Sequence, residues 1–287
     1  MKSILSREFK AYFTSPIGYV FLTFYLFIFG FYFAGINLSQ QLGDYSIIFS
    51  YLVNLLLFTI PLVTMRLLSE ERKNKTDQLL LTSPVSVWGI ILGKYLAAVL
   101  LLVLTLGLTL IQPLILEVLG DVPWPAVIST YIGYFLLGAT LISISLFISA
   151  HTENQIIAAI GSIGIFLFLL LVDAIATLIP AQRLSSFIFI LVIIAIVTLY
   201  IYLSIKDIYI SLIVGFICAI ITTLMYKFNG TLFDGLCTKI LQWFSLFSRY
   251  NNFSSGLLDI GSIVYYLSFI FVFLFLTNQT IEKRRWS

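Results

Sequence analysis

The amino-acid sequence predicts an all-α, polytopic integral membrane protein with about eight transmembrane helices. Of its 287 residues, 60% are hydrophobic and only 10% are charged, whereas soluble domains are roughly one-quarter charged. The mean hydropathy is +1.07. A soluble fold of this length must still wet a large surface, so it could not absorb such an apolar excess. We therefore expect one transmembrane domain covering residues 1–287.

Charged residues divide the chain into apolar stretches that are long enough to cross a membrane. A hydrocarbon core about 30 Å thick needs roughly 20 apolar residues in a helix, and backbone groups in lipid must pair within their own segment. Only Lys206 and Asp207 separate the sixth stretch from the seventh, but together these two are too long for one span. The predicted spans are Ile17–Ile36, Tyr45–Met65, Tyr95–Leu116, Ala126–Ala150, Gln155–Ile179, Leu184–Ile205, Ile208–Tyr226 and Ile260–Ile281.

Lysine and arginine predict which side of the membrane each loop faces. With the N-terminus in the cytoplasm, the inner segments hold twelve of these residues and the outer segments hold four. Cytoplasmic segments of membrane proteins carry such an excess. We therefore expect both termini in the cytoplasm, an even number of spans, and a location in the inner (cytoplasmic) membrane of a cell.

Three segments outside the spans have a character of their own. Met1–Ser15 places apolar residues at helical spacing among basic ones, which predicts a helix lying at the inner membrane interface among lipid headgroups. Arg66–Ser86 is strongly polar, and Pro84 should end any helix there. The segment Lys227–Asp259 is predicted to be extracellular and amphipathic. Its apolar face is formed by Leu232, Leu236, Ile240, Trp243, Phe244 and Phe247.

The sequence lacks the residue patterns of a catalytic, cofactor or metal site. His151 is the only histidine, so two-histidine metal motifs are impossible, and a lone histidine at a turn is more often a plain polar residue. Glu70-Glu71 is similar to the double glutamate of CAAX-type membrane proteases, but those enzymes need further histidines. Gly93-Lys94 lacks the remaining residues of a phosphate-binding loop. Any ATP dependence must therefore come from another chain, and a net charge of +3 is too small to indicate nucleic acid.

Ionisable residues within spans are candidates for a transport pathway, because a charge at mid-bilayer costs about 3 kcal/mol. Asp173 lies about two turns from the outer end of the fifth span, where structural pairing is the main alternative to a pathway role. Lys94 and Glu117 lie at opposite ends of the third span, and Lys94 is expected to extend its ammonium to the headgroups. So few buried acids argue against an ion-coupled carrier.

Several strings in combination resemble permeases of the type-2 class of ABC transporters. Met65–Arg72, followed by Leu79–Val85, resembles the segment after the second span of those permeases, and Arg7–Tyr19 is similar to their amphipathic N-terminal helix. Strings near the C-terminus are similar to the gliding-motility-associated branch, namely Asn252–Asp259, Tyr265–Ser268 and Glu282–Trp286.

The resemblance implies roles for two cytoplasmic segments. Arg66–Ser86 would be the coupling helix, received by a groove on a cytoplasmic ABC ATPase. Its contacts would come from Ser69, Glu70, Glu71, Arg72, Lys73, Lys75 and Thr76. The turn at Ala150–Gln155, with His151 and Glu153, would make a second, smaller contact. ATP and Mg²⁺ would be bound by the ATPase and not by this chain, and a second permease copy or a paralogous permease would complete the substrate path.

Two features depart from the family pattern. Lys75 stands where a glycine commonly precedes the threonine of the first coupling helix, and the helix pair at residues 184–226 exceeds the usual six spans. The function that the sequence favours is the permease subunit of an ABC exporter, non-catalytic by itself, whose uncharged, aromatic-rich spans suit a lipidic or amphipathic cargo. The alternatives are an ion-coupled secondary transporter, which would show internal repeats and broken helices, and a membrane anchor subunit that transports nothing.

Overall fold

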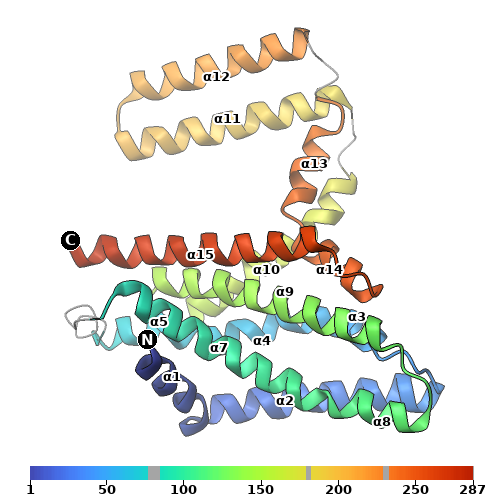
Figure 1. Ribbon diagram of the computed structural model, residues 1–287. Coiled ribbons are helices and arrows are strands. Elements are labelled where there is room, and N and C mark those ends of the chain that lie inside the picture. The colour runs from blue at the N-terminus through green and yellow to red at the C-terminus, as the bar shows by residue number, and fades with distance from the viewer. Residues whose placement is uncertain (77–84, 179–181, 229–232, 287) are drawn as a thin grey trace. The chain divides into compact units, whose positions relative to one another are not determined.

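The computed structural model describes residues 1–76, 85–178, 182–228 and 233–286 (Figure 1). These described residues form helices joined by turns, with no strand among them. The helices are α1 (Lys2–Thr14), α2 (Pro16–Tyr32), the π-helix η1 (Phe33–Leu38), α3 (Ser46–Leu52), the 3-10 helix η2 (Val53–Leu55), α4 (Leu56–Thr64), α5 (Arg66–Lys73), α7 (Val87–Thr109), α8 (Ile111–Leu119), α9 (Trp124–His151), α10 (Gln155–Leu178), α11 (Arg183–Ile205), α12 (Ile208–Phe228), α13 (Leu236–Trp243), α14 (Leu246–Ser254) and α15 (Ile260–Trp286).

The chain divides into two compact units, each with its own packing. Unit 1 comprises Met1–Leu167 and Leu246–Ser287, and unit 2 comprises Phe168–Ser245. Unit 1 therefore contains both ends of the chain, and within it the N-terminus and the end of α15 lie at the same end (Figure 1). The cytoplasmic location of both termini stays a prediction.

Helix α9 forms the centre of unit 1. It packs against α4, α5, α7, α14 and α15, and its apolar stretch is the most deeply buried of the candidate spans. Several of its buried hydroxyls bond within the helix: Thr140, for example, donates to the carbonyl of Leu136 at 2.8 Å. Gly133 lets α14 approach closely, because a Cβ at this position would lie 2.4 Å from Phe253 Cβ. Small and hydroxyl-bearing residues at helix contacts are typical of membrane proteins.

Seven helical stretches among the described residues are long and apolar enough to cross a membrane. They are Pro16–Leu38, Ser46–Lys73, Val87–Leu119, Trp124–His151, Gln155–Leu178, Ser211–Phe228 and Ile260–Arg284. The sixth predicted span corresponds to α11, where Arg183–Leu199 forms a shorter apolar helix. The polytopic, all-helical prediction is confirmed, and the count of eight spans stays a prediction.

The helix that contains the third predicted span begins earlier than the sequence predicts. The sequence predicts a span that starts at Tyr95, with the charge of Lys94 as its boundary. Instead α7 begins at Val87, and the hydroxyl of Ser86 accepts from the amide of Gly89 at 3.2 Å as an N-terminal cap. Lys94 lies inside this helix because carboxylates from other helices neutralise its charge, as described below. The stop predicted at Pro84 and the string Leu79–Leu81 lie outside the described residues.

Unit 2 is built around a helical hairpin of α11 and α12. The two helices are joined by Lys206 and Asp207, as predicted, and Lys206 adopts a left-handed conformation with φ of 57° that ends α11. Gly215 allows the close approach of the pair, since a Cβ there would lie 2.5 Å from Thr198 Oγ1. A side-chain ion pair links the start of α11 to the segment before α13, with Arg183 Nε 2.7 Å from Asp234 Oδ1.

The described part of the segment predicted to be extracellular, Lys227–Asp259, does not form one continuous helix, which corrects the single helical face that the sequence predicts. It forms two helices, α13 in unit 2 and α14 in unit 1, interrupted at Phe244 and Ser245. Phe247 is buried in unit 1, whereas Trp243 and Phe244 are exposed. The periodicity continued across a helix break that single-sequence spacing does not reveal, and Leu232 lies outside the described residues.

Candidate functional site

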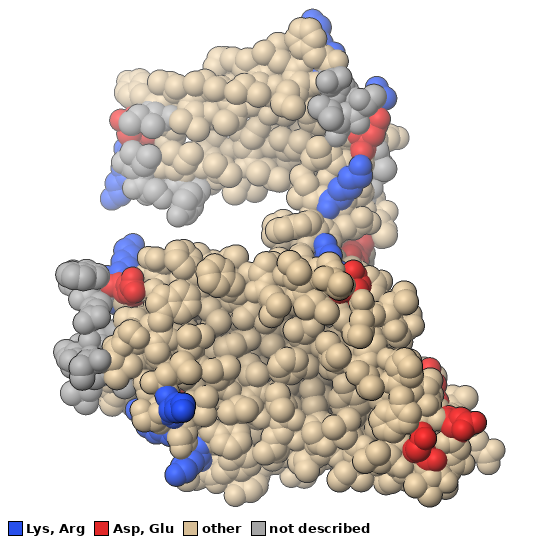
Figure 2. All heavy atoms as spheres, in the orientation of Figure 1, with Lys and Arg blue, Asp and Glu red and all other residues tan. Residues whose placement is uncertain are grey.

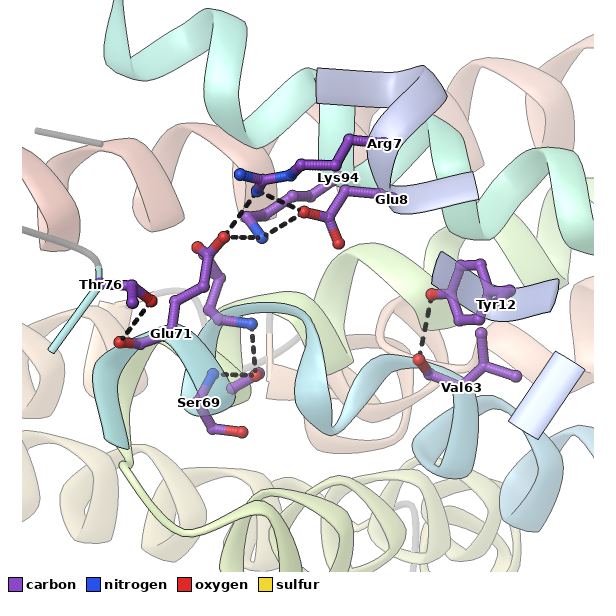
Figure 3. A network of polar contacts seen from close by, with 10 residues as sticks. Arg7, Glu8, Tyr12, Val63, Ser69, Glu71, Thr76 and Lys94 are labelled. Atoms are coloured by element: carbon purple, nitrogen blue, oxygen red, sulfur yellow. Dashed lines mark hydrogen bonds and ion pairs between the residues drawn. The ribbon is translucent and has the colours of Figure 1, made fainter. Parts of the chain in front are cut away.

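A cluster of four charged side chains joins α1, α5 and α7 at one end of unit 1 (Figure 3). The ammonium of Lys94 lies 3.0 Å from Glu8 Oε1 and 2.9 Å from Glu71 Oε1. Arg7 Nη2 lies 2.6 Å from the same oxygen of Glu8 and 2.8 Å from that of Glu71. We call these residues the charge cluster. The charges of its two cations and two carboxylates sum to zero, and one oxygen of each carboxylate contacts both cations.

Burial makes this pairing obligatory for Lys94. Its side chain is 1% exposed, against 14% for Glu8 and 17% for Glu71. An ion buried without a partner costs several kcal/mol, and removal of one member of a buried pair is strongly destabilising. Burial alone would raise the pKa of the Glu8 carboxyl, but the charges and hydrogen bonds of Lys94 and Arg7 outweigh it and lower that pKa below its ordinary value. Lys94 therefore does not extend to the headgroups as expected, because it is held inside the protein.

Further contacts fix α1 on the same helices. The hydroxyl of Tyr12 donates to the carbonyl of Val63 at 3.1 Å. Arg66 Nη1 donates to Ser15 Oγ at 2.9 Å, and the Arg66 guanidinium lies 4.9 Å from the centre of the Tyr12 ring. Part of the apolar face of α1 is thus covered by protein, and its predicted position at the membrane interface stays a prediction.

The joint between α4 and α5 is held by a hydroxyl of α9. Ser149 Oγ accepts from the first-turn amides of α5, from Leu68 at 3.3 Å and from Ser69 at 3.1 Å. It also donates to the carbonyl of Met65 at 3.1 Å. The amides that begin a helix have no partner within it, so Ser149 satisfies groups that a break at Met65 leaves open. Through this hydroxyl α9 contacts the start of the predicted coupling segment.

The two predicted ATPase contact segments lie side by side. Arg72 in α5 pairs with Glu153 in the α9–α10 turn, with Nε 3.0 Å from Oε1. Arg284 of α15 donates to the carbonyl of Ala150, in the last turn of α9. His151 is exposed, and its Nδ1 lies 2.9 Å from the carbonyl oxygen of Phe147. The first and second predicted contacts therefore form one surface at the end of unit 1 that carries both chain ends.

The predicted coupling residues separate into inward and outward groups. Ser69 is buried and Glu71 belongs to the charge cluster, while Glu70 is half-buried. Lys73, Asn74, Lys75 and Thr76 are exposed, and the hydroxyl of Thr76 donates to the carbonyl of Glu71 at 3.2 Å. The surface open to a partner is thus the end of α5 and the turn after it, and residues 77–84 of the predicted segment lie outside the described residues.

The three predicted intramembrane polar residues are not brought together. Lys94 belongs to the charge cluster. Glu117, at the opposite end of unit 1, is exposed and accepts from Trp124 Nε1 at 2.9 Å. Asp173 lies in unit 2, where it accepts a hydrogen bond from the hydroxyl of Ser245. The contact of Asp173 is a structural pairing of the kind that the sequence left open.

Sequence reasoning did not single out Arg7, Glu8 and Ser149 as functional positions. A signal existed for Glu8: it is an acid in a basic amphipathic segment, in the same chain as a lysine placed in an apolar run. For Ser149 no signal existed, because serines recur throughout α9 and its hydrogen bonds depend on the break at Met65.

Comparison with known proteins places the chain in a family. A family model described as ABC-2 family transporter protein matches residues 39–225, which is more than half of the chain. The match includes the predicted coupling segment, the α9–α10 turn and nearly all of the α11–α12 hairpin. No curated protein matches the chain. With its apolar helices and this match, the chain belongs to the ABC-2 transporter family and is a multi-pass membrane permease.

Proposed function

We propose that this chain is the permease subunit of an ATP-driven exporter and receives its energy from a separate ATPase that binds the end of unit 1 with the charge cluster. Permeases of this family typically work with an ATPase partner. The Arg72–Glu153 ion pair carries the proposal, because it joins both predicted contact segments into one surface. A single rigid partner can therefore press on α5 and on the α9–α10 turn together.

The charge cluster connects this surface mechanically to the membrane-spanning helices. Glu71 connects α5 to Lys94 of α7 and Arg7 of α1, and Ser149 connects α5 to α9. A displacement of α5 would therefore be shared with three other helices. In this proposal the cargo is a lipidic or amphipathic molecule, export is its direction, the inner membrane is the location, and a second permease copy or a paralogue completes the path. The likeness to the gliding-motility-associated branch is a sequence likeness and implies nothing about motility.

The experiment compares two charge reversals of one kind. Lys73→Glu alters an exposed cation at the end of α5, and Lys227→Glu alters an exposed cation in the last turn of α12, which is predicted to face outward. The tagged full-length chain is purified from its native membranes. Co-purifying polypeptides that bind ATP are identified by photo-crosslinking with an azido-ATP, and Mg²⁺-dependent ATP hydrolysis is measured.

We expect an ATP-binding polypeptide with the wild-type chain and with Lys227→Glu, and a several-fold loss of that polypeptide and of hydrolysis with Lys73→Glu. The proposal is wrong if the purified chain moves cargo across reconstituted membranes with no ATP-hydrolysing polypeptide present. The placement of the contact surface is wrong if both variants retain the partner equally.

A further inference from the structure

A cavity of about 630 Å³ lies at the end of unit 1 opposite the charge cluster. It is formed by the last turn of η1, the loop after it, the end of α8 and the α8–α9 loop, which lie together at the right of unit 1 in Figure 1. Asn37, Gln41 and Asp121 supply its polar side chains, and four leucines supply most of its apolar wall. Nothing in the permease function described above uses this cavity.

Two loops contact each other closely at the wall of the cavity. Each loop contains the same tripeptide, Leu42-Gly43-Asp44 in one and Leu119-Gly120-Asp121 in the other. Gly43 lies so close to the second loop that a Cβ would be 2.6 Å from the carbonyl oxygen of Asp121. Asp44 stiffens the first loop by accepting from the amide of Ser46 at 2.9 Å and from its hydroxyl at 2.6 Å. The two loops therefore pack closely against each other and form an ordered wall of the cavity.

Asn37 carries an acceptor that the described residues leave unused. Its side chain is 2% exposed, and its amide nitrogen donates to the carbonyls of Leu42 at 2.7 Å and Asp44 at 3.2 Å. Its Oδ1 is buried without a hydrogen-bond partner in the described part of the chain. An unsatisfied buried acceptor costs about 1–3 kcal/mol, so this oxygen would gain from a ligand that donates.

The backbone around Asn37 is also unusual. Asn37 lies in the π-helix η1, and π-helical turns occur frequently at functional sites. Gln41, which lines the cavity, has a φ of 55°, a conformation that costs a non-glycine residue of order 1–3 kcal/mol. Both features lie at the cavity wall, and neither is needed to cross the membrane.

The charges near the cavity indicate which kind of hydrogen-bond donor a ligand there would carry. Lysine and arginine are absent from residues 11–65 and 95–182, which contain every residue that lines the cavity. Asp121 lines it with an exposed side chain, and Asp44 and Glu117 lie in the same two stretches. Red spheres mark this end of unit 1 in Figure 2. The guanidinium of Arg249 in α14 lies 3.9 Å from the centre of the Tyr265 ring and does not line the cavity.

A metal ion is not the occupant that these residues favour. No group of three or more histidine, cysteine, aspartate or glutamate residues that could hold a metal occurs in the described part of the chain. An anion would be repelled by the acidic side chains of the two loops. A neutral hydrocarbon would leave the oxygen of Asn37 unpaired.

The geometry points to a binding site for an ammonium group carried on an apolar body. The ammonium would be attracted by the Asp121 carboxylate and would donate to Asn37 Oδ1, while the apolar body would pack against the leucines. Because neither loop belongs to the ATPase contact surface, this binding requires no nucleotide and no partner, and it can fail or succeed independently of the proposed permease function.

The test measures binding to the purified full-length chain in nanodiscs of uncharged phosphatidylcholine. The probes are phenethylammonium, 2-phenylethanol and phenylacetate, which share an apolar body and differ in charge. Binding is followed by ligand-observed NMR, and empty nanodiscs correct for partitioning into lipid. We expect saturable binding of phenethylammonium, with the other two probes at least ten-fold weaker.

Variants locate the site. Asp121→Asn and Asn37→Leu should each weaken phenethylammonium binding at least ten-fold. Gln40→Ala alters an exposed neighbour that does not line the cavity, and it should bind as the wild type does. Because Asp121 is exposed, its variant keeps the test valid if Asn37→Leu does not fold. Equal binding of 2-phenylethanol, absence of saturable binding, or unchanged binding by Asp121→Asn would each overturn the proposal.

Discussion

Arg72 Nε of α5 lies 3.0 Å from Glu153 Oε1 of the α9–α10 turn. The two residues come from segments separated by two membrane-crossing helices, α7 and α9, yet they meet at the end of unit 1 that holds the charge cluster. Their side chains are 26% and 62% exposed, so the pair itself contributes little to stability. Its importance lies in the surface that it assembles.

Exchanging the charges of Arg72 and Glu153 tests whether their ion pair organises the ATPase contact surface, separately from its effect on stability. We expect Arg72→Glu and Glu153→Arg, made singly, to lower ATP hydrolysis of the complex several-fold, and the double variant to recover most of it. Each change in the free energy of unfolding should stay within about 1 kcal/mol, because Glu153 is exposed and water therefore screens the pair. Thermal unfolding and ATP hydrolysis of the same preparations provide the measurements. Single variants with unchanged hydrolysis would show that this pair does not organise the surface.

Removal of the buried ammonium should be costly. Lys94→Met leaves two half-buried carboxylates sharing Arg7, and breaking a buried pair costs roughly 3–5 kcal/mol. The double variant Lys94→Met with Glu8→Gln restores the charge balance and should recover much of that loss. Lys227→Met, at an exposed position, is the control and should change little. Denaturant unfolding in detergent measures the difference; a double variant no more stable than Lys94→Met would contradict the charge argument.

The docking of α1 should weaken in acid. The carboxyl of Glu8 has a pKa below its ordinary value of 4.5, because Lys94 and Arg7 outweigh the effect of burial. A group whose pKa is lowered on folding stabilises the folded state above its unfolded pKa and loses that contribution as pH falls through its folded value. We therefore expect α1 to loosen below about pH 4.5.

A spin label on residue 3 reports this loosening. Ser3 is exposed in α1, so Ser3→Cys, in a chain with both native cysteines changed to serine, places the label without disturbing the charge cluster. Its mobility should rise as pH falls through the folded-state pKa of Glu8. The same label in a Glu8→Gln chain should show mobility that no longer changes over this range. Identical pH profiles for the two chains would exclude Glu8 as the cause.

Two glycine substitutions test the packing of α9. A Cβ at Gly133 would lie 2.4 Å from Phe253 Cβ, whereas nothing lies within 4 Å of a Cβ at Gly107. Gly133→Ala should destabilise unit 1 by about 1–3 kcal/mol through overpacking. Gly107→Ala should be neutral or stabilising by up to about 1 kcal/mol, since alanine favours a helix interior. Thermal unfolding of both variants decides, and equal midpoints would contradict the close approach of α14 to α9.

Much of the fold follows from composition and spacing, because a bilayer leaves few choices. Long apolar runs must become helices, and the short connection at Lys206 and Asp207 required a hairpin. Boundaries set by charge were less secure. The start of α7 was predicted too late because the charge of Lys94 was read as a helix boundary. That charge is neutralised by Glu8 and Glu71, which lie 86 and 23 positions earlier in the sequence. A single sequence does not reveal such distant partners.

The candidate site was predictable in its segments and not in its contacts. The polar character of Arg66–Ser86 indicated a surface, but which of its residues face outward depends on α1 and α9. Glu71 faces inward because Arg7 and Lys94 lie opposite it. The break after α13 was hidden for the same reason, since Phe247 is buried by packing within unit 1 and not by its own periodicity.

The order of residues in the charge cluster has a consequence for biogenesis. Chains emerge from the ribosome N-terminus first, so Glu8 and Glu71 are synthesised before Lys94. Both counter-ions are therefore already present at the membrane surface when the ammonium arrives, and the helix that carries it can insert with its charge matched. A chain with α1 deleted would therefore have to insert Lys94 with one fewer carboxylate.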